Sequence, residues 1–206
     1  LDPVFRGAYP ADAVADRVAA GHLPGPELPF VRDGDLAAVS RPLDFLGLNY
    51  YSRVVLRAGP DGRRESVPPA ATADLTEMGW ESYPAGLRES LLRVHRDYAP
   101  RTVYVTENGA AYADAADAHG RIVDARRIAY LRGHLLAARE AVAQGVPLAG
   151  YFLWSLLDNF EWAHGYAKRF GLFAVEPQTR RRLRKASASW YHDVVAANAV
   201  PDDDAP

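Results

Sequence analysis

Three short runs of mostly apolar residues predict β-strands in this chain. The runs cover residues 43–51, 102–106 and 149–155. They are rich in β-branched, leucine and aromatic residues, which favour strands. The first run is apolar on both faces, as is typical of a parallel strand that is covered on each side.

The middle strand leads into a carboxylate. Alternation places Val103, Val105 and Glu107 on one face, so Glu107 ends a row of valines. Burying a carboxylate without partners is costly, and Glu107 is therefore either a solvated strand end or a functional group. Asn108 and Gly109 follow, and because both tolerate positive φ they predict a turn.

A period of about 3.6 residues, which marks an amphipathic helix, recurs between and after the strands. It predicts helices from Pro84 to Tyr98, over 124–144 and over 185–197. In the second helix we expect the buried face to consist of Ile128, Leu131, Leu135, Ala138 and Val142. Because strands and helices alternate, we predict an α/β fold built from parallel βα units.

The remaining segments are predicted to be short elements and loops. Residues 2–9 are expected to form a loop before a short helix near Pro10, and the acidic end 200–206 a frayed terminus. Residues 54–56 and the turn residues 59–62 suggest a hairpin, which residues 67–69 continue as a loop. Three parallel strands alone would leave sheet edges and apolar surface uncovered. We therefore expect residues 1–206 to be one incomplete domain.

Composition narrows the chemistry. The chain is 49% hydrophobic and 24% charged with a net charge of −2, which gives no reason to expect nucleic acid or a membrane as partner. It has no cysteine, which excludes disulfides and thiolate chemistry. Its histidines lack the spacing of metal ligands. We expect no metal, no cofactor and a cytoplasmic location.

The chemistry-bearing residues stand at the ends of the three strands. Asn49 and Tyr51 end the first, Glu107 the second and Trp154 the third. In a parallel barrel the catalytic groups gather at the carboxyl ends of the strands. A phenol, a carboxylate and an indole at that edge suit carbohydrate chemistry, because an indole packs on a sugar ring and a carboxylate stabilises a developing oxocarbenium ion. We expect Trp80, by contrast, to be a core or rim aromatic.

Five segments, taken in order, resemble glycoside hydrolase family 1, the family of β-glucosidases. The segments are 43–51, 104–109, 151–162, 165–171 and 185–191. The resemblance implies a (β/α)8 TIM barrel of which this chain supplies strands six to eight with their helices. Residues 1–206 would then be the C-terminal part of a single barrel domain whose strands one to five are absent here.

The resemblance also implies a role for individual residues. Glu107 matches the nucleophile that forms a covalent glycosyl-enzyme, and Tyr51 matches the phenol that hydrogen-bonds to it. Five further residues match substrate contacts: Asn49 near the reacting sugar, Trp154 as the platform beneath it, Glu161 at its outer hydroxyls, Trp162 as a neighbouring indole donor and Phe170 as a pocket wall.

The resulting expectation is a retaining β-glycosidase that hydrolyses terminal β-D-glycosides, such as β-glucosides, oligosaccharides or aryl glycosides. Retention needs two carboxylates, and the resemblance provides only one here, so the N-terminal half of the barrel is the expected partner and the chain alone is expected to be inactive. A non-catalytic carbohydrate- or protein-binding relative is the alternative. A 6-phosphoglycosidase is disfavoured, because Glu161 would repel a phosphate.

Overall fold

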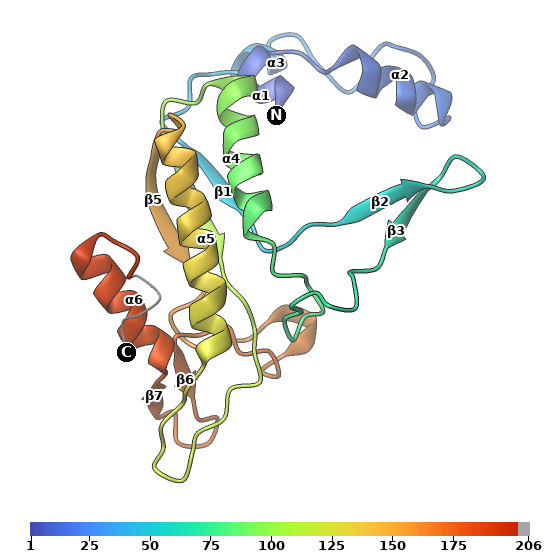
Figure 1. The fold of residues 1–206 in the computed structure, drawn as a ribbon. Coiled ribbons are helices and arrows are strands. Elements are labelled where there is room, and N and C mark those ends of the chain that lie inside the picture. Colours follow the sequence, from blue (N-terminus) through green and yellow to red (C-terminus); the bar gives the residue numbers. More distant parts are fainter. Residues whose placement is uncertain (202–206) are drawn as a thin grey trace. The chain divides into compact units, whose positions relative to one another are not determined.

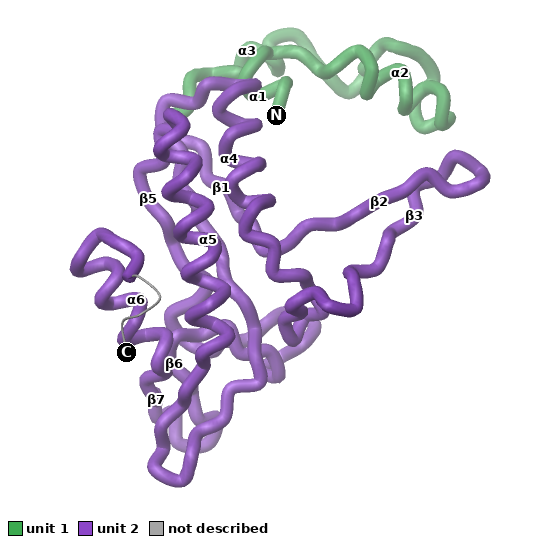
Figure 2. Tube along the Cα trace, viewed as in Figure 1, with its two compact units in different colours: residues 1–44 green, residues 45–206 purple. Residues whose placement is uncertain are grey.

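The computed structural model describes residues 1–201 and divides the chain into two compact units (Figure 2). Residues 1–44 form the first unit, which contains α1 (Asp2–Arg6), α2 (Ala11–Ala19) and α3 (Asp35–Val39). The loop expected at residues 2–9 is thus partly wrong. An aspartate and a proline begin α1 and an arginine ends it, an order that favours a helix. Most of the acidic end expected to fray, residues 202–206, lies outside the described residues.

The second unit begins at residue 45 and is built around a parallel sheet with strand order β1-β4-β5 (Figure 1). Two antiparallel hairpins, β2-β3 and β6-β7, accompany it. Its elements are β1 (Leu46–Asn49), β2 (Val55–Ala58), β3 (Arg64–Val67), α4 (Pro84–Tyr98), β4 (Val103–Asn108), α5 (Ala125–Ala143), β5 (Leu148–Leu153), the 3-10 turn η1 (Trp162–His164), β6 (Phe173–Val175), β7 (Arg182–Arg184) and α6 (Ala186–Ala197).

The predicted βα units are confirmed. The three predicted strands correspond to β1, β4 and β5, the three long helices to α4, α5 and α6, and the hairpin to β2-β3. β1 is shorter than predicted, and β7 was not predicted, because its alternating arginines carry no apolar pattern. None of the helices within residues 1–201 combines the length and the apolar character that a membrane span requires.

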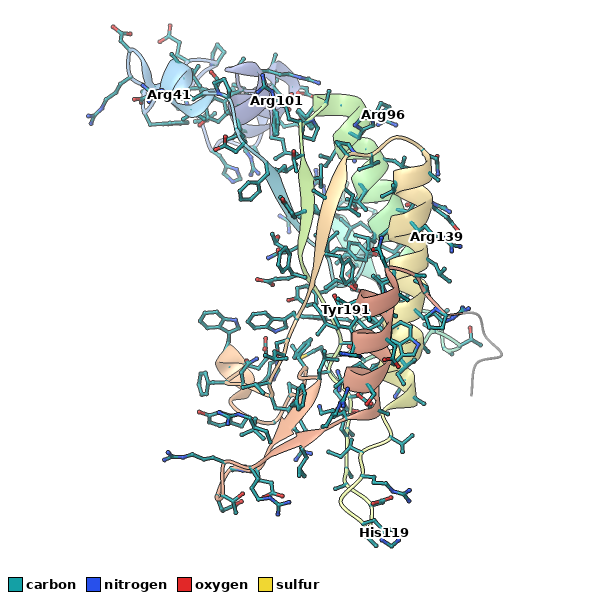
Figure 3. All side chains as sticks on the ribbon, turned by 90° about the vertical axis from the view of Figure 1, so that its left-hand side faces the viewer. Arg41, Arg96, Arg101, His119, Arg139 and Tyr191 are labelled. Atoms are coloured by element: carbon teal, nitrogen blue, oxygen red, sulfur yellow. The ribbon has the colours of Figure 1, made fainter. Side chains whose placement is uncertain are left out.

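One face of the sheet packs against α4 and α5. Val103 and Val105 of β4 are fully buried in one apolar cluster with Leu87 and Leu91 of α4 and Ala138 of α5. In Figure 3, α4, α5 and α6 all lie on the same side of the strands. The row of valines therefore faces the helices.

The opposite face of the sheet is aromatic. The ring of Tyr104 lies between those of Phe45 and Phe152, with centroid distances of 5.3 and 6.1 Å. Phe45 is 53% exposed and Phe152 57%. Within the described sheet, β1 and β5 each pair on one side only. The uncovered apolar surface and strand edges expected from the sequence are thus present.

The buried face of α5 differs from the predicted one. Leu131 and Ala138 are buried as predicted, but Val142 is 46% exposed and Ile128 and Leu135 are only half-buried. The helical period was correct, but the face is rotated, because polar side chains with hydrogen-bond partners are also buried. The additional buried residues are Arg127, Tyr130, His134, Ala137 and Ala141.

Two buried cations join the end of the sheet to α5 and α6. Arg127 pairs with Asp124 at 2.9 Å and also with Asp114, and Lys185 pairs with Asp114 at 2.6 Å. Asp124 accepts hydrogen bonds from the backbone N–H and the hydroxyl of Ser187, at 2.8 and 2.5 Å. Buried charges persist only with such partners, so this network fixes α5, α6 and the segment after β4 to one another.

Lys185 also holds the base of the long loop after β5. Its Nζ lies 3.0 Å from the Asp158 carboxylate, and the same carboxylate accepts the backbone N–H of Gly171 at 2.9 Å. Residues 158–171, which we call the clamped loop, are therefore closed at their base, as in compact surface loops. The clamped loop contains three of the predicted site residues, Glu161, Trp162 and Phe170.

Replacing Lys185 by methionine should destabilise the fold strongly. The substitution leaves Asp158 without its cation and Asp114 with Arg127 alone, and breaking a buried ion pair in this way costs about 3–5 kcal/mol. Arg88→Met is the matched control, because Arg88 pairs with Glu140 at 2.6 Å on the helix surface, where such pairs contribute less than about 1 kcal/mol. The free energy of unfolding from urea titrations measures both, and equal small losses would contradict a structural role of the network.

A second prediction concerns His134, which is fully buried on α5. Burial lowers its pKa from 6.5 to about 4, against the effect of its hydrogen bond to the Tyr130 carbonyl. The unfolded chain takes up a proton near pH 6.5 that the folded chain does not, so the free energy of unfolding should fall by roughly 3 kcal/mol as the pH drops from 6.5 to 4.

The measurement is urea unfolding at about pH 7 and at about pH 4.5. His134→Leu should show a smaller loss of stability over this interval than the parent chain. His119 lies on an exposed loop (Figure 3), and His119→Leu should retain the full pH dependence. An unchanged pH dependence in His134→Leu would show that His134 is not the titrating group.

Candidate active site

The predicted site residues gather at the carboxyl ends of the parallel strands. Glu107 stands near the end of β4 and Tyr51 just after β1, and the Tyr51 hydroxyl donates a hydrogen bond to the Glu107 carboxylate at 2.6 Å. Burial first, and then this hydrogen bond and the charge of Glu107, raise the pKa of Tyr51 well above its usual 10.0. The phenol therefore remains a donor throughout the neutral range, and the hydrogen bond expected from the resemblance is confirmed.

A β-bulge brings Glu107 to this face. Between β1 and β4 the register moves from Leu48–Val105 to Asn49–Glu107, so Thr106 is an extra residue in β4. Val105 faces the helices, whereas both Thr106 and Glu107 contact residues of the opposite face. The prediction that Glu107 continues the row of valines is wrong, because the bulge interrupts the alternation.

Thr106 orients the predicted sugar contact Asn49. Its hydroxyl donates a hydrogen bond to Asn49 Oδ1 at 2.6 Å, and Asn49 is exposed at the end of β1. Gly47 makes room for Thr106, because a Cβ at position 47 would come within 3.0 Å of its methyl group. Thr106 thus occupies the bulge, and its hydroxyl engages the Oδ1 atom of the Asn49 side-chain amide.

Aromatic rings surround Tyr51. Its ring centroid lies 5.5 Å from that of Trp80 and 6.2 Å from that of Phe170, and Phe170 is only 2% exposed. Phe170 thus packs beside Tyr51, and its role as a pocket wall stays a prediction. Trp80, from the segment between β3 and α4, is a site neighbour that sequence reasoning left in the core or at the rim. No periodic pattern surrounds it in the sequence, so Trp80 is identified by its place in the fold.

A pocket of about 450 Å³ opens beside Tyr51 and Trp80. It extends to the β2-β3 hairpin, and its polar lining includes Arg53 and Glu81, which form a salt bridge at 2.7 Å. The pocket has the size and mixed lining of a small-molecule site.

The predicted site residues of the clamped loop differ in burial. Glu161 is 8% exposed, and its Oε2 is buried without a hydrogen-bond partner in the described structure. Its negative charge contributes to the raised pKa of Tyr51, so the two side chains sense each other. Trp162, by contrast, is 81% exposed, and the structure does not bring its indole into the cluster of Tyr51, Glu107 and Phe170.

The turn predicted at Asn108 and Gly109 is wrong. Neither residue has positive φ, and Asn108 is fully buried with its side chain hydrogen-bonded. Gly109 is required by close approach, because a Cβ there would lie 1.7 Å from the carbonyl oxygen of Trp154. The ends of β4 and β5 thus touch, and the half-buried Trp154 is held beside the Glu107 strand.

Within residues 1–201 no group of three or more His, Cys, Asp or Glu side chains is arranged to hold a metal ion. The arrangement at the strand ends consists of one carboxylate held by a neutral phenol, a second buried carboxylate with an unpaired oxygen, and aromatic surfaces. Such a set can bind hydroxyl groups and an apolar ring face, and it can offer a nucleophile to an electrophilic carbon.

Comparison with known proteins agrees with this chemistry. The model of glycosyl hydrolase family 1 matches residues 1–200. β-Glucosidase A of Thermotoga maritima is 42% identical over 98% of this chain and 44% of the relative. The bifunctional β-D-glucosidase/β-D-fucosidase of Bifidobacterium breve is 39% identical over 97% of this chain and 46% of the relative. The chain spans less than half the length of these curated relatives.

Solved structures give the same result. The β-glucosidase of Thermotoga maritima in complex with castanospermine superposes with a TM-score of 0.87 at 41% identity, over 98% of this chain and 44% of that one. Its complex with galacto-hydroximolactam gives a TM-score of 0.86 over 97% and 44%. The predicted fold, a partial (β/α)8 barrel, is confirmed.

Proposed function

The chain belongs to glycosyl hydrolase family 1, and on that premise we propose that it forms the C-terminal part of the catalytic barrel of a retaining β-glucosidase. The observation that carries the proposal is the 2.6 Å hydrogen bond from Tyr51 to Glu107 at the strand ends. It orients a carboxylate toward the face on which a barrel has its substrate.

In this proposal Glu107 is the nucleophile. A carboxylate oxygen of Glu107 attacks the anomeric carbon of a terminal β-glucoside, the glycosidic C–O bond breaks, and a glycosyl ester forms on Glu107. The leaving oxygen takes its proton from a second carboxylic acid. Water then gives a proton to that second carboxylate, attacks the anomeric carbon and releases Glu107 with the β configuration retained.

Tyr51 supports both steps without being consumed. Its raised pKa keeps the hydroxyl protonated, so the hydrogen bond holds Glu107 in one orientation before attack. Preorganised donors of this kind need no rearrangement during the reaction. When Glu107 becomes an ester, the same hydroxyl is free to stabilise the oxygen that develops charge as the ester breaks.

The substrate contacts follow from burial and position. Glu161 has a buried oxygen without a partner, which suits hydroxyl groups remote from the anomeric carbon. Asn49 contacts the reacting sugar, Trp154 lies beneath its ring and Phe170 closes the pocket. Trp162 is 81% exposed, and we propose that its indole N–H reaches the outer hydroxyls of a bound sugar.

The second carboxylate is assigned to the part of the barrel that precedes these βα units. Retention places the two carboxyl groups about 5–5.5 Å apart. The remaining strands would pair with the free edges of β1 and β5, which would enclose the aromatic face around Phe45 and Phe152. The proposed partners are therefore a β-glucoside or related oligosaccharide or aryl glycoside, and the N-terminal half of the barrel.

The nucleophile is tested in a completed barrel, in which this chain follows the preceding segment of the Thermotoga maritima relative. Glu107→Gly should lower kcat by several orders of magnitude, because no group remains to form the ester. The cavity that it creates admits azide, and attack from that side on an activated β-glucoside should yield the α-glycosyl azide. NMR of the product identifies the anomer.

The unfused chain is the control and should show no turnover, because the second carboxylate is missing. A β-glycosyl azide, or hydrolysis near the parental rate without azide, would exclude Glu107 as nucleophile. An inactive completed barrel with an intact Glu107 would favour the alternative of a non-catalytic relative.

Glu161→Ala tests the sugar contact in the same completed barrel. A hydrogen bond to a charged group contributes about 1.5–3 kcal/mol, so kcat/KM on β-glucosides should fall roughly 10- to 100-fold. Glu140→Ala is the control, since Glu140 pairs with Arg88 on the helix surface and should retain parental kinetics. Parental kinetics in Glu161→Ala would contradict the assignment.

A further inference from the structure

The strand ends that carry Tyr51 and Glu107 depart from the regular register of the sheet. The register between β1 and β4 shifts at Asn49, and that between β4 and β5 shifts between Val105 and Asn108. A bulge leaves a residue without regular pairing and allows the strand to bend. One backbone hydrogen bond, from the Tyr50 N–H to the Glu107 carbonyl at 2.9 Å, still joins the two strand ends, and the separation of Tyr51 from Glu107 depends in addition on side-chain contacts.

Asn108 supplies such contacts from the residue next to Glu107. It is 0% exposed, and its Nδ2 donates to the Tyr50 carbonyl at 2.7 Å and to the Tyr130 hydroxyl at 3.1 Å. Its Oδ1 accepts a hydrogen bond from the Tyr151 hydroxyl. The amide thus joins β4 to β1, to β5 and to α5, and both of its N–H groups are used.

Tyr130 closes the connection to Tyr51. Its side chain is 2% exposed on α5, and its hydroxyl accepts from Asn108 and donates to the Tyr51 carbonyl at 3.1 Å. The ring of His134 stacks on it with centroids 4.0 Å apart, which limits rotation of the phenol. One hydroxyl therefore touches both the neighbour of Glu107 and the backbone of Tyr51.

We propose that Asn108 and Tyr130, which we call the brace, are positioning residues that set the geometry of the Tyr51–Glu107 hydrogen bond from the helix side of the sheet. The brace acts through the backbone, because its side chains bond to the carbonyl groups of Tyr50 and Tyr51 rather than to the Glu107 carboxylate. Its catalytic consequence rests on the function proposed above, whereas its structural consequence does not.

The direct test is proton NMR of the chain as it stands. A hydroxyl held in a 2.6 Å bond to a carboxylate is a strong, charge-assisted donor, and its proton should give a downfield, slowly exchanging resonance that Tyr51→Phe removes. In Tyr130→Phe this resonance should move upfield and exchange with water at least roughly tenfold faster, because the strand ends open locally.

Tyr191→Phe is the matched control. Tyr191 lies on α6 (Figure 3), and its hydroxyl donates to the Tyr151 carbonyl at 3.3 Å rather than to Asn108 or Tyr130. Losing this hydroxyl should lower stability but leave the Tyr51 resonance in place. A resonance that is unchanged in Tyr130→Phe, or equally changed in Tyr191→Phe, would overturn the proposal.

A second variant covers the possibility that Tyr130→Phe does not fold. Tyr151→Phe removes only the donor to Asn108 Oδ1 and keeps the ring, so Asn108 remains in place with one bond fewer. The Tyr51 resonance should shift in the same direction by a smaller amount, and an unchanged resonance in this folded variant would contradict the brace.

The catalytic consequence of the brace is tested by kinetics in the completed barrel. Tyr130→Phe should lower kcat roughly 10- to 100-fold with little change in KM, because misplacement of a reacting group costs rate rather than ground-state binding. Parental kcat in Tyr130→Phe would contradict the brace. If the parent barrel were inactive on β-glucosides, the proposed function would fail while the NMR result would still decide on the brace.

Discussion

Side chains alternate along a strand, and β4 can present its carboxylate only by breaking that alternation. Val103 and Val105 must face α4 and α5 to form the core, and Asn108 must face the same way to reach its hydrogen-bond partners. The extra residue Thr106 lets Glu107 face the opposite side between them. The core and the site therefore share one strand without competing for the same positions.

This arrangement buries a set of polar groups behind the site, and nearly all of them have hydrogen-bond or ion-pair partners. Arg127 and Lys185 lie among carboxylates, and Asn108 makes three side-chain contacts with its neighbours. A buried donor or acceptor left alone costs more than its hydrogen bond contributes. Glu161 Oε2 is an exception at the site itself, as a group that awaits a ligand would be.

The sequence predicted the βα units because their apolar periods are long and regular. It misassigned the buried face of α5, since Arg127 and His134 are polar and only their partners in space make burial favourable. Asn108 has the residue type of a turn, but in the fold its side-chain amide is buried and makes three hydrogen bonds. The hydrogen bond from Tyr51 to Glu107 came from family resemblance, and Trp80 could not be found from spacing at all.

The clamped loop keeps the contacts that hold it and its candidate ligand groups in different places. Its base is fixed from outside by Lys185, through Asp158 and Gly171, while its middle carries Glu161 and the exposed Trp162. Under the proposed function, substitutions in that middle would change the groups offered to a ligand and would leave the ion pairs that hold α5 and α6 in place. Divergence of ligand preference can thus proceed within one loop while the barrel wall remains unchanged, which makes this segment a natural unit of evolutionary variation.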